Sequence, residues 1–157
     1  MPSQRPRSAT ATPPARPRHH HRPRRVLVRL HRPHSGEPAW QFDGKKLAYS
    51  SPLFKDGKLF TAIGDEGNLF AFTAKTGDKL WTSTAAATIY DSSFSAAKGN
   101  LFIATVKGTL CAFNARDGKP LWQYSLGPSH LLASPAADQS NVYISNQSGD
   151  VLALPLR

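Results

Sequence analysis

Three tryptophans recur at a fixed interval, and this spacing constrains the fold more than any other feature of the chain. Trp40, Trp81 and Trp122 are separated by 41 residues and again by 41, and a glycine stands four residues before each, at Gly36, Gly77 and Gly118. A period of this length indicates one supersecondary unit repeated along the chain. Such a unit cannot bury its apolar face alone, so we expect consecutive units to stack.

Each unit contains short apolar runs separated by Gly, Asn, Asp and Lys, which is the pattern of strands joined by tight turns. Asp56-Gly57 and Asp117-Gly118 are strong turn sequences. No stretch shows sustained helical spacing. The predicted strands lie near 37–43, then 47–53, 58–63, 67–73 and 78–84, then 88–95, 100–106, 108–114 and 119–125, and finally 130–136, 141–146 and 149–154. The sequence therefore predicts an all-β fold, a partial β-propeller of about three four-stranded antiparallel blades.

The tryptophans have a physical task in such a fold. A large indole on an outer strand covers the neighbouring blade and buries its apolar body, while its N–H reaches a backbone carbonyl. The preceding glycine makes the turn into that strand, where a positive φ is needed. We expect the small residues Ala71, Ala112 and Ala153 to fit tight places between sheets.

The pattern Ala-x-[Thr/Asn]-x-x-[Thr/Asp]-Gly-x-x-x-Trp occurs from Ala71 to Trp81 and from Ala112 to Trp122. It resembles the tryptophan-docking motif of pyrroloquinoline-quinone-type propeller repeats. WD repeats differ because their tryptophan is followed by aspartate. The resemblance covers residues 36–157. It implies either a quinoprotein dehydrogenase or a non-catalytic propeller, such as the outer-membrane assembly lipoprotein that scaffolds β-barrel insertion, and the fold alone does not choose between them.

Three units are too few for a closed ring, because propellers usually have about four to eight blades. We expect an open arc with apolar sheet faces at both ends, the segment 37–43 being an unpaired outer strand. The chain is then a piece of a larger protein, self-associates to complete a propeller, or remains a marginal open assembly. Trp40 alternatively docks on the first blade of its own chain.

Residues 1–35 differ in composition from residues 36–157. The first segment has nine arginines and no acid, whereas the second has eleven Lys/Arg and ten Asp/Glu. The Pro-rich first segment is expected to be a disordered leader, and the second segment to hold the propeller repeats. The favoured interpretation is a solvated leader, or one that results from a misplaced start. The alternatives are binding of nucleic acid or anionic surfaces through charge alone, a weak metal site at His19–His21, or a degraded targeting segment.

The 41-residue offset places residues 26–34 where a third strand of a preceding unit would lie, and Val26, Val28 and Leu30 are a trace of it. The sequence contains no run of about 20 apolar residues and no visible export signal. The family resemblance implies a periplasmic or cell-envelope location, which the residues themselves leave undecided.

The sequence offers little chemistry. The single cysteine, Cys111, excludes an intrachain disulfide and fits a buried core position. The acids fall mostly in predicted turns, where they cap backbone groups, and form no metal-binding cluster. We therefore predict no cofactor or metal. Pyrroloquinoline quinone and calcium belong only to the alternative, a fragment of a dehydrogenase of this family.

One group of residues is a candidate ligand or partner face. Tyr49 and Tyr90 stand nine residues after successive tryptophans, and Asp91 and His130 are their neighbours in the repeat. These residues enter the predicted inner strands, near the propeller axis, although simple packing is the alternative explanation. The leading hypothesis is a non-catalytic propeller-repeat segment that presents strand edges and loops to a protein partner in an envelope or outer-membrane assembly.

Overall fold

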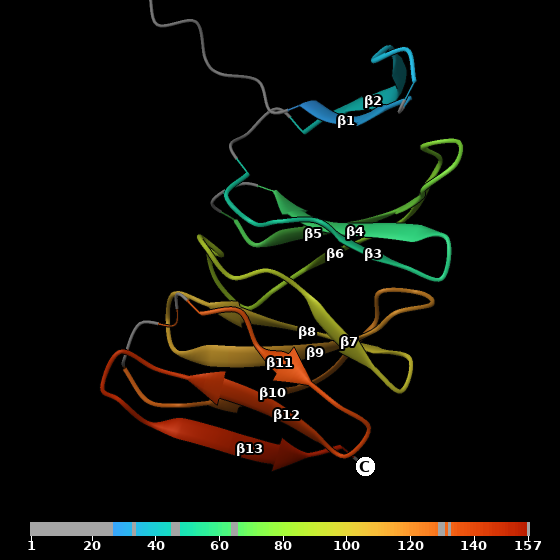
Figure 1. The fold of residues 1–157 in the computed structure, drawn as a ribbon. Helices are drawn as coiled ribbons and strands as arrows, with labels where there is room; N and C mark the ends of the chain where they lie inside the picture. The colour runs from blue at the N-terminus through green and yellow to red at the C-terminus, as the bar shows by residue number, and fades with distance from the viewer. Residues whose placement is uncertain are drawn as a thin grey trace, which may run out of the picture.

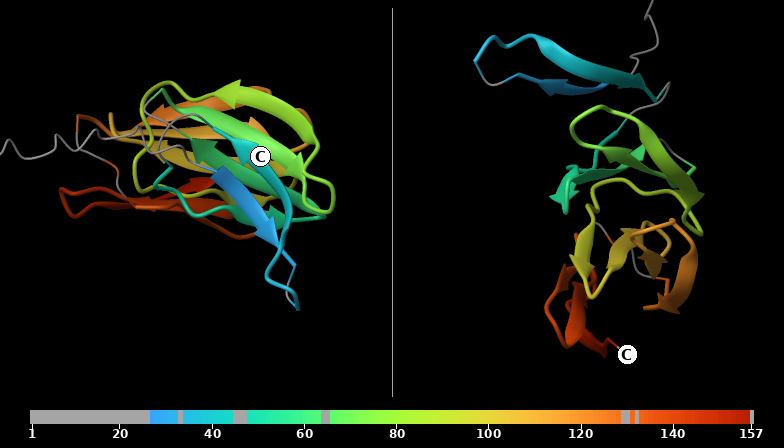
Figure 2. Two further views of the ribbon diagram at one scale, coloured as in Figure 1. Left: turned by 90° about the horizontal axis from the view of Figure 1, so that it is seen from above. Right: turned by 90° about the vertical axis from the view of Figure 1, so that its right-hand side faces the viewer.

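The structure, a computed structural model, describes residues 27–32, 34–44, 48–63, 66–128, 131 and 133–156. Within these ranges the chain forms only strands, turns and loops, and every pair of neighbouring strands is antiparallel. Four small sheets follow one another along the chain and stack face to face (Figures 1 and 2).

The N-terminal sheet consists of β1 (Leu27–His31) and β2 (Pro38–Asp43). Blade 1 consists of β3 (Leu53–Lys55), β4 (Lys58–Ile63), β5 (Asn68–Thr73) and β6 (Lys79–Thr84). Blade 2 consists of β7 (Ser95–Ala97), β8 (Asn100–Thr105), β9 (Thr109–Asn114) and β10 (Pro120–Ser125). Blade 3 consists of β11 (Ala136–Ala137), β12 (Asn141–Ser145) and β13 (Val151–Pro155). The predicted fold class is thereby confirmed.

The inner hairpins of blades 1 and 2 use turns that only certain residues tolerate. Asp56 and Gly57 have φ angles of 49° and 71°, and Lys98 and Gly99 have 48° and 75°. Positive φ at both central residues is the signature of a type I′ turn, whose twist matches that of the two strands it joins. These turns fix the strand register from which the rest of each blade is built.

The inner strands lie later in the chain than predicted. The expected strands 47–53, 88–95 and 130–136 are replaced by β3, β7 and β11, which begin near the end of each predicted range. Pro52 and Pro135 have no N–H to give to a ladder. Ser51 and Ser93, which precede β3 and β7, donate backbone hydrogen bonds to serine side chains of the following blade instead.

The N-terminal end also differs from the expectation. The segment predicted as an unpaired outer strand, 37–43, is β2, and it pairs with β1. β1 lies inside the segment expected to be a disordered leader, 1–35, of which residues 1–26 lie outside the described ranges. Val28 and Leu30 alternate with Arg29 and His31, the period of two that a strand requires.

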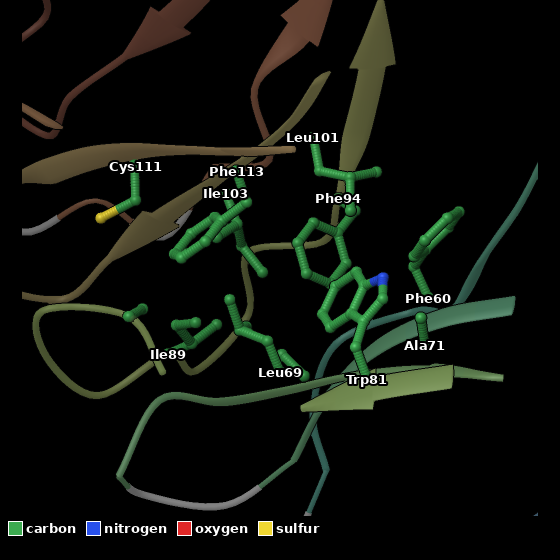
Figure 3. Packing of buried hydrophobic residues seen from close by; sticks show 12 residues of the cluster. Phe60, Leu69, Ala71, Trp81, Ile89, Phe94, Leu101, Ile103, Cys111 and Phe113 are labelled. Atoms are coloured by element: carbon green, nitrogen blue, oxygen red, sulfur yellow. The ribbon is translucent and has the colours of Figure 1, made fainter. Parts of the chain in front are cut away.

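Two apolar clusters hold the stack together. One fills the space between blades 1 and 2, and the other fills the space between blades 2 and 3. Strand β8 serves both, because Leu101 and Ile103 belong to the first cluster while Phe102 and Ala104 belong to the second. Alternate side chains of one strand are therefore buried on opposite faces of blade 2. Figure 3 shows part of the first cluster.

Candidate functional site

The indole of Trp40, on β2, fastens the N-terminal sheet to blade 1. Its Nε1 donates a hydrogen bond of 2.8 Å to the carbonyl oxygen of Ala74. Its ring lies against Gly77, where an added Cβ would come within 2.5 Å of the indole. Gly77 has a φ of 77°, so both its backbone conformation and its lack of a side chain are needed for this contact. The chain thus adopts the alternative in which Trp40 docks on the first blade of its own chain.

The same contact recurs one unit later. Trp81, on β6, donates from Nε1 to the carbonyl oxygen of Ala115 at 3.3 Å. An added Cβ on Gly118 would lie 2.6 Å from the indole. The ring is only 8% exposed and points into the cluster that contains Phe60 and Phe94 (Figure 3). The indoles of Trp40 and Trp81 therefore each dock on the glycine turn of the following sheet.

Trp122, on β10, is the third member of the series and has no such partner among the described residues. Its ring is half-buried and lies 5.9 Å from the ring of Phe102, measured between centroids. Beside it is an open cavity of about 520 Å³, lined by Asn100, Leu121, Trp122, Pro155 and Leu156. This cavity occupies the place that a glycine turn fills beside Trp40 and Trp81.

The first glycine of the series shows the reverse situation. Gly36 has a φ of 69° and nothing within 4 Å of an added Cβ. The two turn glycines that carry an indole have steric contacts instead. In the described part of the chain, the indole of Trp122 therefore contacts no turn glycine, and the turn glycine Gly36 contacts no indole.

A polar contact near the start of each blade accompanies the tryptophans. The backbone N–H of Ser51 donates to Ser93 Oγ at 2.8 Å, and the N–H of Ser93 donates to Ser134 Oγ at 2.8 Å. The side chain of the buried Ser92 accepts a bond of 2.9 Å from the N–H of Ala104. The Ser51–Ser93 and Ser93–Ser134 bonds join neighbouring blades, whereas the Ser92 bond lies within blade 2.

The structure brings together two of the four residues predicted as an axial face. The rings of Tyr49 and Tyr90 meet edge to face, with centroids 6.1 Å apart, and remain 55% and 44% exposed. Asp91 is exposed beside them. His130 lies outside the described residues. Leu131, the third-unit counterpart of the tyrosines, is buried and adds nothing to this surface.

The far end of the stack carries an apolar strand edge. In β13, Val151 is 75% exposed and Ala153 is exposed as well. The counterparts of Ala153 in blades 1 and 2, Ala71 and Ala112, are fully buried. Across the described residues, β13 pairs with β12 on one side only, so its other edge presents free backbone groups.

The opposite end carries an apolar groove of about 460 Å³ between the N-terminal sheet and blade 1, lined by Leu30, Trp40, Phe54, Gly57, Leu59, Ala74 and Lys75. Phe54 is 66% exposed beside it. The equivalent position in blade 2 is the small residue Ala96. Phe54 thus places a large exposed ring where the repeat has only the methyl group of alanine. An exposed apolar surface of this kind makes the groove a second candidate contact surface.

The described groups with shifted pKa values are two aspartates that accept hydrogen bonds in turns and one buried thiol. Hydrogen bonds from the N–H of Lys119 lower the pKa of Asp117, and those from Asn141, Ser140 and Tyr143 lower the pKa of Asp138. Burial raises the pKa of the Cys111 thiol. Among the described residues, no three His, Cys, Asp or Glu side chains lie close enough to hold a metal ion.

The family model described as outer membrane protein assembly factor BamB matches residues 24–157. The chain belongs to this family. The predicted resemblance is confirmed, and the match begins within the segment expected to be the leader. None of the curated proteins compared with the chain matches it significantly. The described residues contain no helix with the length and apolarity that crossing a bilayer requires.

Solved structures agree with this BamB-family fold. BamB from Moraxella catarrhalis superposes with a TM-score of 0.69 at 22% identity, over 76% of this chain and 38% of that one. Quinohemoprotein alcohol dehydrogenase from Comamonas testosteroni gives 0.60 at 18% identity, over 70% and 19%. The computationally designed Ika4 protein gives 0.68 at 14% identity, over 78% and 74%. The chain thus spans less than half of the Moraxella protein, and these likenesses show the fold.

Proposed function

We propose that this BamB-family chain is a non-catalytic propeller segment that acts as a protein-interaction scaffold. The observation that carries the proposal is the open edge of β13, with Val151 75% exposed on a strand whose sequence counterparts in blades 1 and 2 are interior strands. A free strand edge binds an extended segment through main-chain hydrogen bonds, while alternate side chains supply specificity. No chemical step is needed for this role.

The other surfaces fit the same role. The exposed tyrosine pair, Tyr49 and Tyr90, presents flat rings with polar ends, and such residues are enriched at protein interfaces. The groove beside Phe54 presents apolar side chains at the other end of the stack. By membership in a family described as an outer membrane protein assembly factor, the proposed partner is a protein of outer-membrane assembly.

A capture experiment with a matched pair of variants tests the proposal. Tagged protein is incubated with solubilised envelope proteins, and the bound partner is identified by mass spectrometry. Val151→Lys places a charge on the open edge and should abolish capture. Thr82→Lys makes the same kind of change on β6 of blade 1, at an exposed position, and should leave capture intact. Equal capture by both variants would contradict an edge-mediated role.

The alternative of a dehydrogenase fragment has its own assay. Purified protein is loaded with pyrroloquinoline quinone and calcium, and dye reduction is followed with alcohols and sugars. The scaffold proposal expects no reduction above the protein-free rate. Reduction that requires the folded chain would replace the scaffold proposal with the enzymatic one.

A further inference from the structure

We infer that the cavity between blades 1 and 2 binds a small aromatic carboxylate. The cavity has a volume of about 180 Å³. Apolar side chains and cations from both blades line it, namely Phe60, Lys55 and Lys58 of blade 1 and Ala96, Leu101 and Arg116 of blade 2. It lies between two four-stranded sheets, away from both ends of the stack. A small ligand at this place goes beyond the scaffold role, which requires none.

A small side chain at one position of the repeat leaves the space open. Ala96 of β7 corresponds to Phe54 of β3, since they face Leu101 and Leu59 respectively across equivalent ladders. Each of the two residues lines the hollow between its own blade and the preceding sheet. The methyl group of Ala96 therefore leaves room at the position from which Phe54 projects a phenyl ring.

The floor of the cavity suits an apolar ring. Phe60 and Leu101 are 2% and 0% exposed, and both belong to the cluster between the two blades (Figure 3). Ala96 and Ala115, which also line the cavity, pack against this cluster. An engineered cavity of about 150 Å³ with walls of this kind binds benzene. The volume between blades 1 and 2 is thus sufficient for one six-membered ring.

The rim on the blade 1 side carries two cations that repel each other. Lys55 and Lys58 are directly opposite across the β3–β4 ladder, and the alternation of the strand places Lys58 on the same side of the sheet as Phe60. Like charges in facing positions are unfavourable. Blade 2 has no such repulsion, because the corresponding pair is Ala97 and Asn100. A bound anion would offset the repulsion between the two lysines.

A third cation comes from the opposite wall. Arg116 follows β9 in blade 2 and lines the same cavity. Within the described ranges, no ion pair joins Arg116 or either lysine to a carboxylate. Lys55 Nζ donates to the carbonyl oxygen of Ala96 at 3.5 Å, which leaves further N–H groups for a ligand. Asp56 also lines the cavity, but as the first residue of the type I′ turn it is exposed. Three cations and one carboxylate make the lining positive.

The two properties of the cavity together define the ligand class. A carboxylate matches a planar guanidinium, which can donate two parallel hydrogen bonds to it, and the lysines add positive charge from the other wall. An aromatic ring attached to the carboxylate removes apolar surface from water by entering the cavity. A neutral ring would leave the cations unmatched, and a small inorganic anion would leave the apolar walls uncovered.

Isothermal titration calorimetry of the full chain with benzoate tests the inference. Benzoate has both the ring and the charge, whereas benzamide has the same shape without the charge, and acetate has the charge without the ring. We expect benzoate to bind at millimolar concentrations or below, and each of the other two to bind about tenfold more weakly or worse. Added sodium chloride should weaken benzoate binding because mobile ions screen the cations.

Three variants locate the ligand. Ala96→Phe gives blade 2 the ring that blade 1 has at this position and should abolish binding. Lys58→Gln removes one charge at nearly constant length and should weaken binding about fivefold. The matched control is Lys107→Gln. Lys107 is exposed in the turn between β8 and β9, at the opposite end of blade 2 from the cavity, and its replacement should leave binding unchanged.

Thermal unfolding adds a readout of opposite sign. Lys58→Gln relieves the repulsion from Lys55, so it should raise the melting temperature of the free protein. The same variant should reduce the increase in melting temperature that benzoate produces, because a ligand stabilises the folded state in proportion to how well it binds. A variant that had merely lost its fold would show a lower melting temperature without ligand.

Three results would overturn the inference. The first is wild-type protein that binds no benzoate at millimolar concentrations. The second is binding of benzamide as tight as that of benzoate, which would remove the role of the cations. The third is unchanged benzoate binding by folded Ala96→Phe, which would place the ligand outside this cavity.

Discussion

Replacing Gly118 by alanine is the sharpest test of how the blades are fastened. The new methyl group would lie 2.6 Å from one indole atom of Trp81 and 2.7 Å from another. These distances are far below van der Waals contact, so the indole must leave its position. Gly99→Ala is the control, because Gly99 has nearly the same φ and nothing within 4 Å of the added carbon.

The two substitutions share one energetic term and differ in another. A non-glycine residue in the left-handed region costs about 1–2 kcal/mol at either site. Only Gly118→Ala also displaces an indole that is 8% exposed. Complete removal of a buried Trp or Phe side chain costs about 3–5 kcal/mol, and a displaced ring keeps part of its burial. We therefore expect Gly118→Ala to be about 2 kcal/mol more destabilising than Gly99→Ala.

Urea unfolding followed by circular dichroism measures the difference. If the free energy of unfolding falls by about 2 kcal/mol per molar urea, a difference of about 2 kcal/mol lowers the midpoint of Gly118→Ala by about 1 M relative to the control. In a Trp81→Ala background the two glycine substitutions should have equal effects, because contacting residues are energetically coupled. Equal midpoints in the wild-type background would refute the account of the indole as the fastener between blades 1 and 2.

Three further predictions concern smaller features. Ser92→Ala leaves the buried N–H of Ala104 without an acceptor and should lower the free energy of unfolding by about 1–3 kcal/mol; an unchanged urea midpoint would show that the bond adds nothing. Asp138→Ala should lower the melting temperature at neutral pH. Because the folded pKa of Asp138 is lowered, its contribution is present above the unfolded pKa and lost as the pH falls through the folded value. The gap from wild type must therefore close in acid, and a constant gap would contradict this assignment. The Cys111 thiol, buried and with a raised pKa, should resist maleimide in the native protein and react once in denaturant, whereas rapid native labelling would show that it is accessible.

The repeat made much of the fold predictable. The 41-residue interval gave the number of blades, and the outer three strands of blades 1 and 2 lie within a residue or so of their predicted ranges. The glycines and tryptophans also pointed to their mutual contact, since a large ring and a residue without a side chain recur at one offset. The period is informative because successive units pack against one another through the same indole–glycine contact.

Other features depend on contacts that no single unit reveals. The serine bonds between Ser51, Ser93 and Ser134 join different units, so neither partner is apparent from one unit alone. β1 was obscured by its position next to an Arg-rich, Pro-rich segment, and within it Arg29 is exposed while Val28 is half-buried. The common offset of Tyr49 and Tyr90 placed them on one face, but their edge-to-face ring contact could be known only from the structure.

The two-sided burial of β8 has a consequence for how the stack comes apart. Its residues from Leu101 to Thr105 are all inaccessible to water, whereas β1 and β13 each have a flank open to solvent. In a linear array stability is set by nearest-neighbour interfaces, so opening starts at the two extremities and moves inward. Amide protons of β8 should then exchange with deuterium last, by global opening, and those of the terminal strands first, by fraying. Blade 2 would then remain folded in every partially opened form of the protein.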